Sequence, residues 1–412
     1  MHRFLSRTIA LAASAFCAAA FATPPRTPVE ILFVGDSYTF GRVDPVMDYN
    51  TANVHDLTAA FDAADPTGTN AYEPHPWGGV PGIFKKFTDE AGLNYDVSIS
   101  ARNAASLRGQ FLDTASSVWD LRGNVASRKW NVVVLQDLSD IALPAGKGKD
   151  ANMAQFRAYV DKFVTYIHSG AAEDYTETQL YGSLAACEAT GLSKASCDVA
   201  RIVPPNPNAS ADTKVYLTAT WARPDMVFAH KITVADPYSP SGEPIVDTSS
   251  AGGEATLYYS TLDGMFTDLH NDFVTEAATN PGIEALMPVG DAFRWAVDRH
   301  LVKFDQFYDA NGVFTPDEPG QPLNLWWDDR LHASRYGSYL DALVQFGKIT
   351  GLDPMRFGWS EGAARELGIS LRDALFLQWV ASRTLGVTPE RPCPLVGDWR
   401  CGNAGGSGPG HE

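Results

Sequence analysis

The chain has 412 residues, of which 45% are hydrophobic and 20% charged, the ordinary composition of a folded globular protein. Its 49 acidic residues against 32 basic ones give a formal net charge of −17, which disfavours electrostatic binding to nucleic acid or to an anionic membrane. A chain of this length holds either two domains or one elaborated domain, and we expect a single domain over residues 23–390.

The N-terminus has the pattern of a secretory signal peptide over residues 1–22. Arg3 and Arg7 form a basic start, and an apolar run too short to span a bilayer follows them. The three residues before Thr23, Ala-Phe-Ala, have the form of a cleavage site. A retained membrane anchor is the alternative. Because no later segment is apolar enough to cross a membrane, we predict a secreted or periplasmic protein.

Five short runs of β-branched and apolar residues predict the strands of a parallel sheet, buried on both faces. They are residues 29–34, 95–99, 130–135, 214–220 and 285–289. Helical patterns alternate with them at residues 153–167, 291–302 and 334–349, and a further helix is expected between Ser370 and Gly386. This alternation predicts a flavodoxin-like, three-layer α/β/α sandwich with a sheet of about five strands.

Three segments rich in Gly, Pro, Ser, Thr and Asn are interpreted as insertions, at residues 44–77, 171–212 and 236–262. The cysteines that follow the signal fall into two local pairs. In an oxidising compartment these pairs predict the disulfides Cys187–Cys197 and Cys393–Cys401, the second of which would close a Gly-rich tail over residues 391–412. A zinc site is the alternative, disfavoured because neither pair has a C-x-x-C motif or a nearby histidine.

A Gly-Asp-Ser turn directly follows the first predicted strand. Its serine, Ser37, therefore lies at the carboxyl end of a strand, where open α/β sheets bind their ligands. Such a serine exposes a hydroxyl that can attack a carbonyl and a backbone N–H that can bind the resulting oxyanion. Asp36 is expected to hold the turn by accepting nearby N–H groups. On its own the motif is also compatible with a simple helix N-cap.

The second candidate element lies far downstream, where Asp329 precedes His332 by three residues, just ahead of a predicted helix. This spacing lets the carboxylate orient the imidazole, which can take a proton from a serine and return it to a leaving group. Asp328 is a rival for the role of the acid. By itself this pattern is weak, because a surface histidine near an aspartate is common.

Together the two patterns resemble the SGNH superfamily of GDSL-like esterases. That family begins with a Gly-Asp-Ser block on its first strand and ends with Asp-x-x-His before its last long helix, and this chain has both in that order. The resemblance extends over about residues 29–349, interrupted by the insertions. It implies a serine esterase in which Ser37 is the nucleophile, His332 the base and Asp329 the residue that orients the base.

The two middle blocks of the family are altered in this chain. The second block normally supplies a glycine whose backbone N–H faces the oxyanion, and Ala104 is the best match; an alanine keeps this donor if its φ is negative. The third block normally contains an asparagine, which Gln136 replaces, as in a branch with a Leu-Gln pair. The resemblance implies an oxyanion hole of Ser37, Ala104 and Gln136, whose amide can still donate. Alternatively, Gln136 only ends its strand.

Three tryptophans are candidates for the substrate pocket. Trp221 follows the fourth predicted strand and should lie at the same edge of the sheet as Ser37. Trp326 and Trp327 directly precede the acid–histidine segment. Each of them could line an acyl or sugar pocket or could pack in the core.

These patterns imply two-step acyl transfer without a metal or an organic cofactor. The expected partner is a small-molecule or polysaccharide ester. Secretion, acidic charge and polar insertions favour an O-acetylated carbohydrate, and a lipid, other acyl ester or polyester is the second choice. An inactive carbohydrate-binding SGNH scaffold is the non-enzyme alternative. A metallohydrolase using Asp328, Asp329 and His332 is a third.

Overall fold

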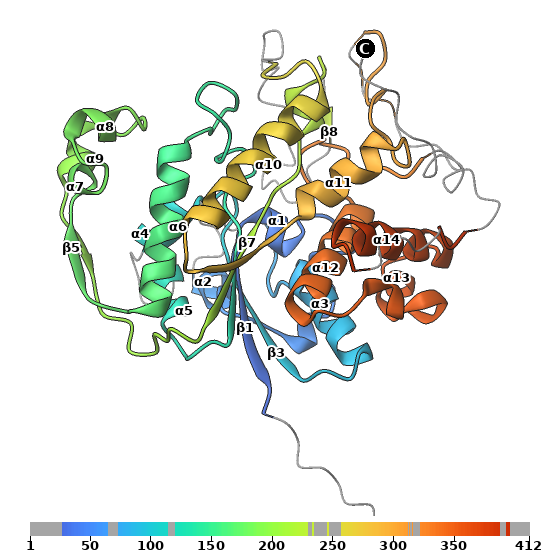
Figure 1. Cartoon of the computed structure of the whole chain (residues 1–412), viewed down its shortest axis with the longest axis horizontal. Helices are drawn as coiled ribbons and strands as arrows, with labels where there is room; N and C mark the ends of the chain where they lie inside the picture. The colour runs from blue at the N-terminus through green and yellow to red at the C-terminus, as the bar shows by residue number, and fades with distance from the viewer. Residues whose placement is uncertain are drawn as a thin grey trace, which may run out of the picture.

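A six-stranded sheet lies at the centre of the structure, with helices on both of its faces (Figure 1). In spatial order its strands are β10 (Ile283–Met287), β7 (Lys214–Thr218), β4 (Val132–Leu135), β1 (Val29–Gly35), β3 (Tyr95–Ala101) and β2 (Val54–Asp56). Every neighbouring pair is parallel. The predicted three-layer α/β/α fold is therefore confirmed, with one strand more than expected.

The computed structural model describes residues 27–64, 73–113, 120–229, 233–234, 245–246, 257–311, 313, 315, 322–387 and 393–395. The predicted signal peptide at residues 1–22 lies outside this part of the chain, as do Cys401, most of the C-terminal tail and most of the segment 236–262. Within the described residues no helix combines the length and the apolar character that crossing a membrane requires.

The extra strand, β2, lies at the edge of the sheet inside the segment that the sequence assigns to an insertion. It is three residues long and pairs with β3 from Val54 to Asp56. Only Val54 is buried, so the strand has too few apolar residues to produce a periodic signal. Its position against β3, and not its own sequence, makes it a strand.

One face of the sheet is covered by α3 (Gly79–Glu90), α11 (Val289–Asp298), α12 (Arg335–Thr350), α13 (Gly362–Glu366) and α14 (Leu371–Thr384), most of them on the right in Figure 1. Aromatic contacts join these helices: Phe87 of α3 packs against Phe346 of α12, and Trp295 of α11 against Trp379 of α14. The predicted helix starts are confirmed for α12 and α14, where Ser334 and Ser370 cap the first turn.

The other face carries α4 (Leu107–Leu112), α5 (Leu121–Val125), α6 (Met153–His168) and α10 (Leu262–Thr279). Phe111 of α4 packs edge to face on Phe163 of α6, and Phe156 of α6 on Phe273 of α10. Further short elements in the described part of the chain are α1 (Ser37–Phe40), α2 (Ala59–Ala64), β8 (Thr233–Val234) and β9 (Ile245–Val246). Turns of 3-10 helix lie at Thr51–Asn53, Pro224–Met226, Pro354–Arg356 and Gly358–Ser360.

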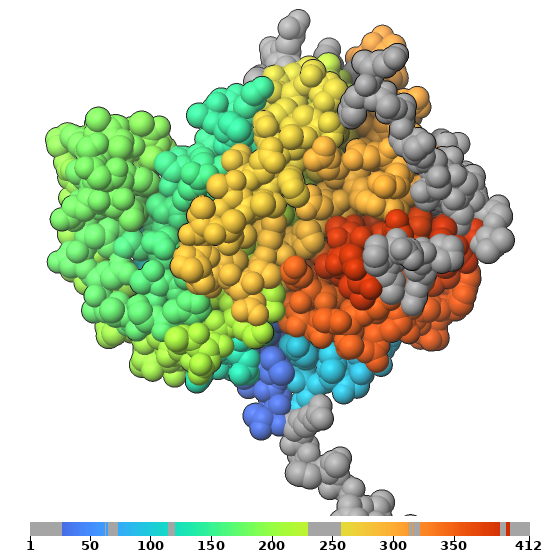
Figure 2. Space-filling view, viewed as in Figure 1, coloured from blue at the N-terminus to red at the C-terminus, as the bar shows by residue number. Residues whose placement is uncertain are grey.

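An arm formed by residues 171–212 projects from the body as a separate lobe, green in Figure 2. It consists of the antiparallel pair β5 (Glu173–Tyr175) and β6 (Arg201–Val203) and of α7 (Glu177–Leu180), α8 (Leu184–Glu188) and α9 (Lys194–Asp198). The predicted disulfide Cys187–Cys197 joins α8 to α9. Buried Glu177 accepts two bonds from Arg108 of α4, at 2.6 and 2.7 Å, and thereby fastens the arm to the body.

Candidate active site

The nucleophile candidate, Ser37, lies at the carboxyl end of the central strand β1, where it begins the single turn of α1. Asp36 caps this turn by accepting the N–H of Tyr38 at 2.9 Å, the structural role that the sequence predicts for it. The side chain of Asp36 is buried, which raises its pKa to about 6 although the N–H of Tyr38 and the amide of Gln136 oppose the rise. The turn therefore holds Ser37 rigidly at the middle of the sheet edge.

The base candidate, His332, lies in a short loop between Leu325 and Ser334. The N–H of Trp327 donates to the carbonyl of His332 at 2.8 Å, and the N–H of Ser334 to the carbonyl of Leu325 at 2.9 Å, which closes the loop into a hairpin. Antiparallel pairing of Trp326 with Ala333 continues the same ladder. The hairpin places His332 directly before α12, so the helix and the loop fix its position together.

Within this loop the carboxylate of Asp329 uses both of its oxygens. Oδ2 lies 2.6 Å from Nδ1 of His332, and Oδ1 accepts the N–H groups of Leu331 and His332 at 2.9 Å each. Burial alone would raise the pKa of Asp329, but the charge and hydrogen bond of His332 and the two N–H groups together lower it. Asp329 thus stays ionised and orients the imidazole, and its rival Asp328 does not line the pocket.

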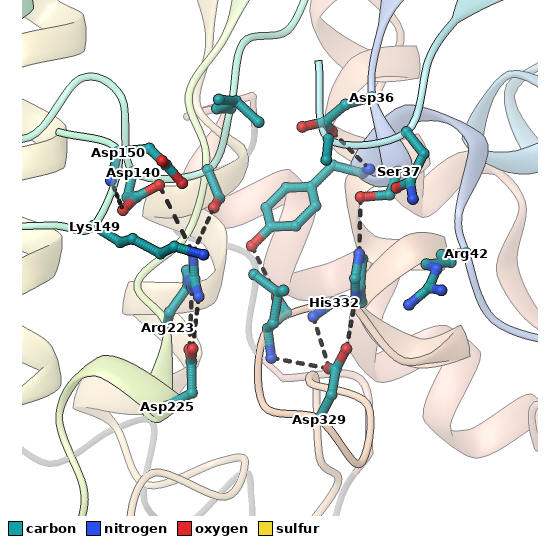
Figure 3. A pocket seen from close by; sticks show the side chains of 16 residues that line it. Asp36, Ser37, Arg42, Asp140, Lys149, Asp150, Arg223, Asp225, Asp329 and His332 are labelled. Atoms are coloured by element: carbon teal, nitrogen blue, oxygen red, sulfur yellow. Dashed lines mark hydrogen bonds and ion pairs between the residues drawn. The ribbon is translucent and has the colours of Figure 1, made fainter. Parts of the chain in front are cut away.

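The two distant segments meet in the folded chain. Nε2 of His332 lies 2.8 Å from Oγ of Ser37, although the residues are 295 positions apart in the sequence (Figure 3). Ser37, His332 and Asp329 therefore form one continuous row of hydrogen bonds. A row of this kind can move a proton from a serine hydroxyl to an imidazole while a carboxylate stabilises the resulting charge.

Ala104 lies in a tight turn that follows β3, beside the serine. The N–H of Ala105 donates to the carbonyl of Arg102 at 3.3 Å, and the N–H of Arg102 to the carbonyl of Gly35 at 3.1 Å. The φ of Ala104 is +50°, so the condition of a negative φ attached to its prediction is not met. A positive φ at this place in a turn is usual for glycine. Ala104 nevertheless lines the pocket, and its N–H and that of Ser37 bind no atom of the described residues.

Gln136 takes a different role from the expected one. Its Oε1 accepts the N–H of Asp36 at 2.9 Å and the hydroxyl of Thr39 at 2.8 Å, and its Nε2 donates to the carbonyl of Asp137. Gln136 is not among the residues that line the pocket. Its assignment to an oxyanion hole is therefore corrected, because the amide lies outside the pocket lining and one of its two N–H groups already binds a backbone carbonyl. Gln136 instead supports the nucleophile turn from below, pressed against Gly35, where a Cβ would lie 2.5 Å from Oε1.

Asn103 is the amide that the sequence reasoning missed. It precedes Ala104 in the same turn and lines the pocket, and its side chain binds no atom of the described residues. An amide that faces a pocket without a partner can donate its N–H to a developing oxyanion. The signal was present in the sequence, because an asparagine stands directly before the alanine that replaces the glycine of the family.

The pocket around these residues has a volume of about 300 Å³. Its lining residues are Asp36, Ser37, Tyr38, Arg42, Asn103, Ala104, Leu138, Ser139, Asp140, Lys149, Asp150, Arg223, Asp225, Asp329, Leu331 and His332. Half of them are ionisable Asp, Arg or Lys side chains, so charged groups surround a pocket that also has apolar surface. It therefore suits a small polar ligand better than a long apolar chain.

Opposite the serine, the pocket has a charged wall built around Arg223 (Figure 3). Arg223 binds Asp225 through two parallel bonds of 3.0 and 2.6 Å, and its Nη1 donates to Oγ of Ser139 at 3.0 Å. Burial alone would lower the pKa of Arg223, but Asp225 and Asp140 raise it well above its usual value. The guanidinium is thus permanently charged and held in a fixed orientation. The sequence reasoning named none of these residues as part of the site.

None of the three candidate tryptophans is among the residues that line the pocket. Trp221 is 1% exposed and donates from Nε1 to the carbonyl of Leu331 at 3.2 Å. Trp326 is fully buried and donates to the carbonyl of Ala222 at 3.0 Å. Trp327 contributes its backbone to the hairpin described above. Their assignment to a substrate pocket is therefore corrected: Trp326 and Trp327 belong to the loop that carries His332, and the indole N–H groups of Trp221 and Trp326 fasten this loop to the body.

Outside the row, the described part of the chain contains further buried ionisable groups, such as the pair His75–Asp56 at 2.6 Å. Asp137 is buried behind the serine and accepts the N–H groups of Leu107 and Leu138 at 2.9 and 2.8 Å; burial raises its pKa to about 7. Throughout the described ranges no group of three or more His, Cys, Asp or Glu side chains could hold a metal ion.

Comparison with known proteins adds distant likenesses only. The sequence matches no known family model, and no curated protein matches it. A DUF4886 family protein from Bacteroides uniformis is 12% identical with a TM-score of 0.42, over 89% of this chain and 97% of that chain. A protein from Slackia heliotrinireducens, provisionally assigned as an SGNH hydrolase, is 16% identical with a TM-score of 0.34, over 78% and 100%. At TM-scores below 0.5 neither likeness supports a conclusion about function.

Proposed function

We propose that this protein is a serine hydrolase that cleaves carboxylic esters through an acyl-enzyme. The observation that carries the proposal is the row of hydrogen bonds from Ser37 through His332 to Asp329, with 2.8 Å between Oγ and Nε2 and 2.6 Å between Nδ1 and Oδ2. This is the geometry that nucleophilic catalysis by a serine requires. Its position in an open pocket at the carboxyl edge of the sheet gives a substrate access to the hydroxyl.

In the proposed reaction, Oγ of Ser37 attacks the ester carbonyl while its proton passes to Nε2 of His332. The tetrahedral oxyanion collapses, the bond between the carbonyl carbon and the alcohol oxygen breaks, and His332 gives its proton to the departing alcohol. A water molecule then attacks the acyl-enzyme by the same route, and the acid leaves. Asp329 keeps the imidazole oriented and stabilises its charge in both steps.

The oxyanion is bound in this proposal by two backbone N–H groups and one side chain. Ser37 and Ala104 supply the backbone donors, both without partners among the described residues. Asn103 supplies the amide that the family normally places in its third block. Removing one such donor ordinarily raises the barrier by about 3–4 kcal/mol.

The charged wall supports an ester whose alcohol carries hydroxyl groups. Arg223 and Lys149 offer donors, and Asp140, Asp150 and Asp225 offer acceptors, at the edge of the same pocket. Hydroxyl groups can bind both kinds of partner, whereas a long acyl chain would leave these charges dehydrated and unpaired. We therefore place an O-acetylated carbohydrate first among the substrates and an ester with a long acyl chain second.

A fluorophosphonate probe tests the serine directly. Wild-type protein is expected to be labelled, and labelling should vanish in Ser37→Ala because the probe reacts only with an activated hydroxyl. Ser139→Ala is the matched control, since Ser139 is the second serine that lines the pocket; this variant should still be labelled. Folded wild-type protein that is not labelled would contradict the enzyme and favour a binding protein that keeps the scaffold.

The substrate class is tested by chain length. p-Nitrophenyl acetate and acetylated xylan should be hydrolysed, and kcat/KM should fall steeply from acetate to octanoate because the small pocket and its charged lining groups disfavour a long chain. A rate that rises with chain length would contradict the carbohydrate proposal and favour a lipid or polyester.

We also propose that the protein is exported, as its N-terminal pattern and the disulfide Cys187–Cys197 support. Expression of the full chain followed by N-terminal sequencing should show a mature protein that begins at Thr23. A chain that remains uncleaved in the cytosol would contradict this.

A further inference from the structure

We propose that Tyr38 and Trp221 form a clamp on the carbonyl of Leu331, and that this clamp positions His332 against the serine. The inference rests on the proposed roles of Ser37 and His332 and assigns two positioning residues to that reaction. Neither residue has to touch the substrate in order to act, because both work through the backbone of the loop that carries the base.

One backbone oxygen receives both donors of the clamp. The carbonyl oxygen of Leu331 accepts the hydroxyl of Tyr38 at 2.8 Å and Nε1 of Trp221 at 3.2 Å. The same peptide group continues with the N–H of His332, which donates to Oδ1 of Asp329 at 2.9 Å. The peptide between Leu331 and His332 is therefore held on both sides. Bonds arranged in a chain of this kind polarise and strengthen one another.

The two donors are themselves immobilised by ring stacking. The rings of Tyr38 and Trp221 lie parallel, 4.0 Å apart with 1° between their planes. Trp221 in turn stacks on Phe293 of α11 at 4.8 Å and 6°. Tyr38 and Trp221 are only 4% and 1% exposed. Close packing on both sides leaves such rings little freedom to rotate, so the hydroxyl and the indole N–H stay aimed at the carbonyl.

The clamp joins the two segments that supply the reacting groups. Tyr38 directly follows Ser37 in the nucleophile turn, whereas Leu331 directly precedes His332 in the hairpin. The bonds that Asp329 makes orient the imidazole within its own loop, but they do not place that loop against the serine. The hydroxyl of Tyr38 does so, independently of the bond between Oγ and Nε2. A displacement of about 1 Å between reacting groups can cost a hundredfold in rate, so this second link matters to the reaction.

Tyr38→Phe tests the clamp because it removes one hydroxyl and keeps the ring stack. We expect kcat for p-nitrophenyl acetate to fall about tenfold while KM stays within about twofold, since the loss concerns alignment and not binding. Trp221→Phe should act in the same direction. In the double variant the carbonyl of Leu331 has neither donor. The fold-decrease in kcat of this variant should therefore exceed the product of the fold-decreases in the two single variants.

Tyr339→Phe is the matched control. The hydroxyl of Tyr339 is as deeply buried and donates to Oε2 of Glu361 at 2.9 Å, but it lies in α12 away from the pocket. This variant should lose thermal stability to a similar extent and keep the wild-type kcat and KM. If Tyr38→Phe does not fold, Trp221→Phe is the variant that decides.

Two results would overturn the clamp: a wild-type kcat in folded variants at both positions, or a loss of kcat in Tyr339→Phe as large as in Tyr38→Phe. Failure of the proposed function is recognised separately, as wild-type protein that no fluorophosphonate probe labels.

Discussion

The two walls of the pocket are held in different ways. The wall that carries Ser37 and His332 is held at its backbone atoms: a strand-end turn, a closed hairpin, the N–H groups that bind Asp329, and the carbonyl of Leu331 that binds Tyr38 and Trp221. The opposite wall is fixed by side chains, with Arg223 paired to Asp225 and bound to Ser139. Bonds to backbone atoms fix the course of the loops themselves, whereas paired side chains can be exchanged without rebuilding the loops.

This difference indicates a division of labour. Proton transfer requires atoms placed to within a fraction of an ångström, which the turn and the hairpin provide. Recognition of a polar ligand requires donors and acceptors that can vary with the ligand, which the charged wall provides. Substitutions in the first wall should therefore change kcat, and substitutions in the second should change KM.

The largest effect is expected for Asp329→Asn. The amide keeps an acceptor for the two backbone N–H groups but can no longer stabilise a charged imidazole, so kcat should fall by about a thousandfold or more. Steady-state kinetics with p-nitrophenyl acetate measure this. Asp328→Asn is the control and should stay close to wild type, because Asp328 does not line the pocket. A large loss of kcat in Asp328→Asn, with kcat close to wild type in Asp329→Asn, would show that Asp328 is the acid.

The next effect separates the two candidate amides. Asn103→Ala should lower kcat by about a hundredfold with little change in melting temperature, because it removes an oxyanion donor that supports no other group. Gln136→Ala should mainly lower the free energy of unfolding, by about 2–3 kcal/mol, since it leaves the buried N–H of Asp36 without its acceptor. Thermal melts beside kinetics distinguish them. Loss of kcat without loss of stability in Gln136→Ala would restore the original assignment.

A smaller effect is expected in the charged wall. Arg223→Lys keeps the charge but loses the paired bonds to Asp225, so KM for an acetylated sugar should rise about tenfold, equivalent to about 1.4 kcal/mol of binding. kcat should change little. p-Nitrophenyl acetate, which has no sugar hydroxyls, serves as the control substrate and should show no such rise. An equal loss with both substrates would mean that this wall also serves the chemistry.

The smallest effect concerns Asp137, which is buried behind the first wall. Its pKa is raised by burial to about 7 from an ordinary value near 3.8, so the folded state binds this proton more tightly than the unfolded state does. The contribution of Asp137 to stability is therefore fully present below about pH 4 and declines as the pH rises to about 7. Asp137→Asn should flatten this decline and be more stable than wild type at pH 8.

Melting temperatures at pH 4, 6 and 8 measure the flattening. Asp212→Asn is the control, because the side chain of Asp212 is 91% exposed. An unchanged slope in Asp137→Asn would show that this carboxyl is ionised in the folded protein at acidic pH.

Much of the fold could be predicted because its signals are local. Five of the six sheet strands, the helix starts at Ser334 and Ser370 and the disulfide Cys187–Cys197 follow from hydrophobic runs, caps and short spacings. The end of α11 could not be predicted. That helix stops at Asp298 because His300 adopts a left-handed φ of 54°, where no glycine marks the turn.

By itself the sequence determined which acid, base and alcohol meet, because each lies in a turn whose position at a strand end or before a helix is set by neighbouring residues. Only the tertiary structure decided which other side chains lie around these three residues in the pocket. Gln136 points under the turn and Asn103 into the pocket because pairing of β1 with β3 and β4 decides which groups each strand end presents. Arg223 and Lys149 lie side by side on one wall of the pocket because segments far apart in the chain fold to one edge, and no local sequence pattern predicts that they come together.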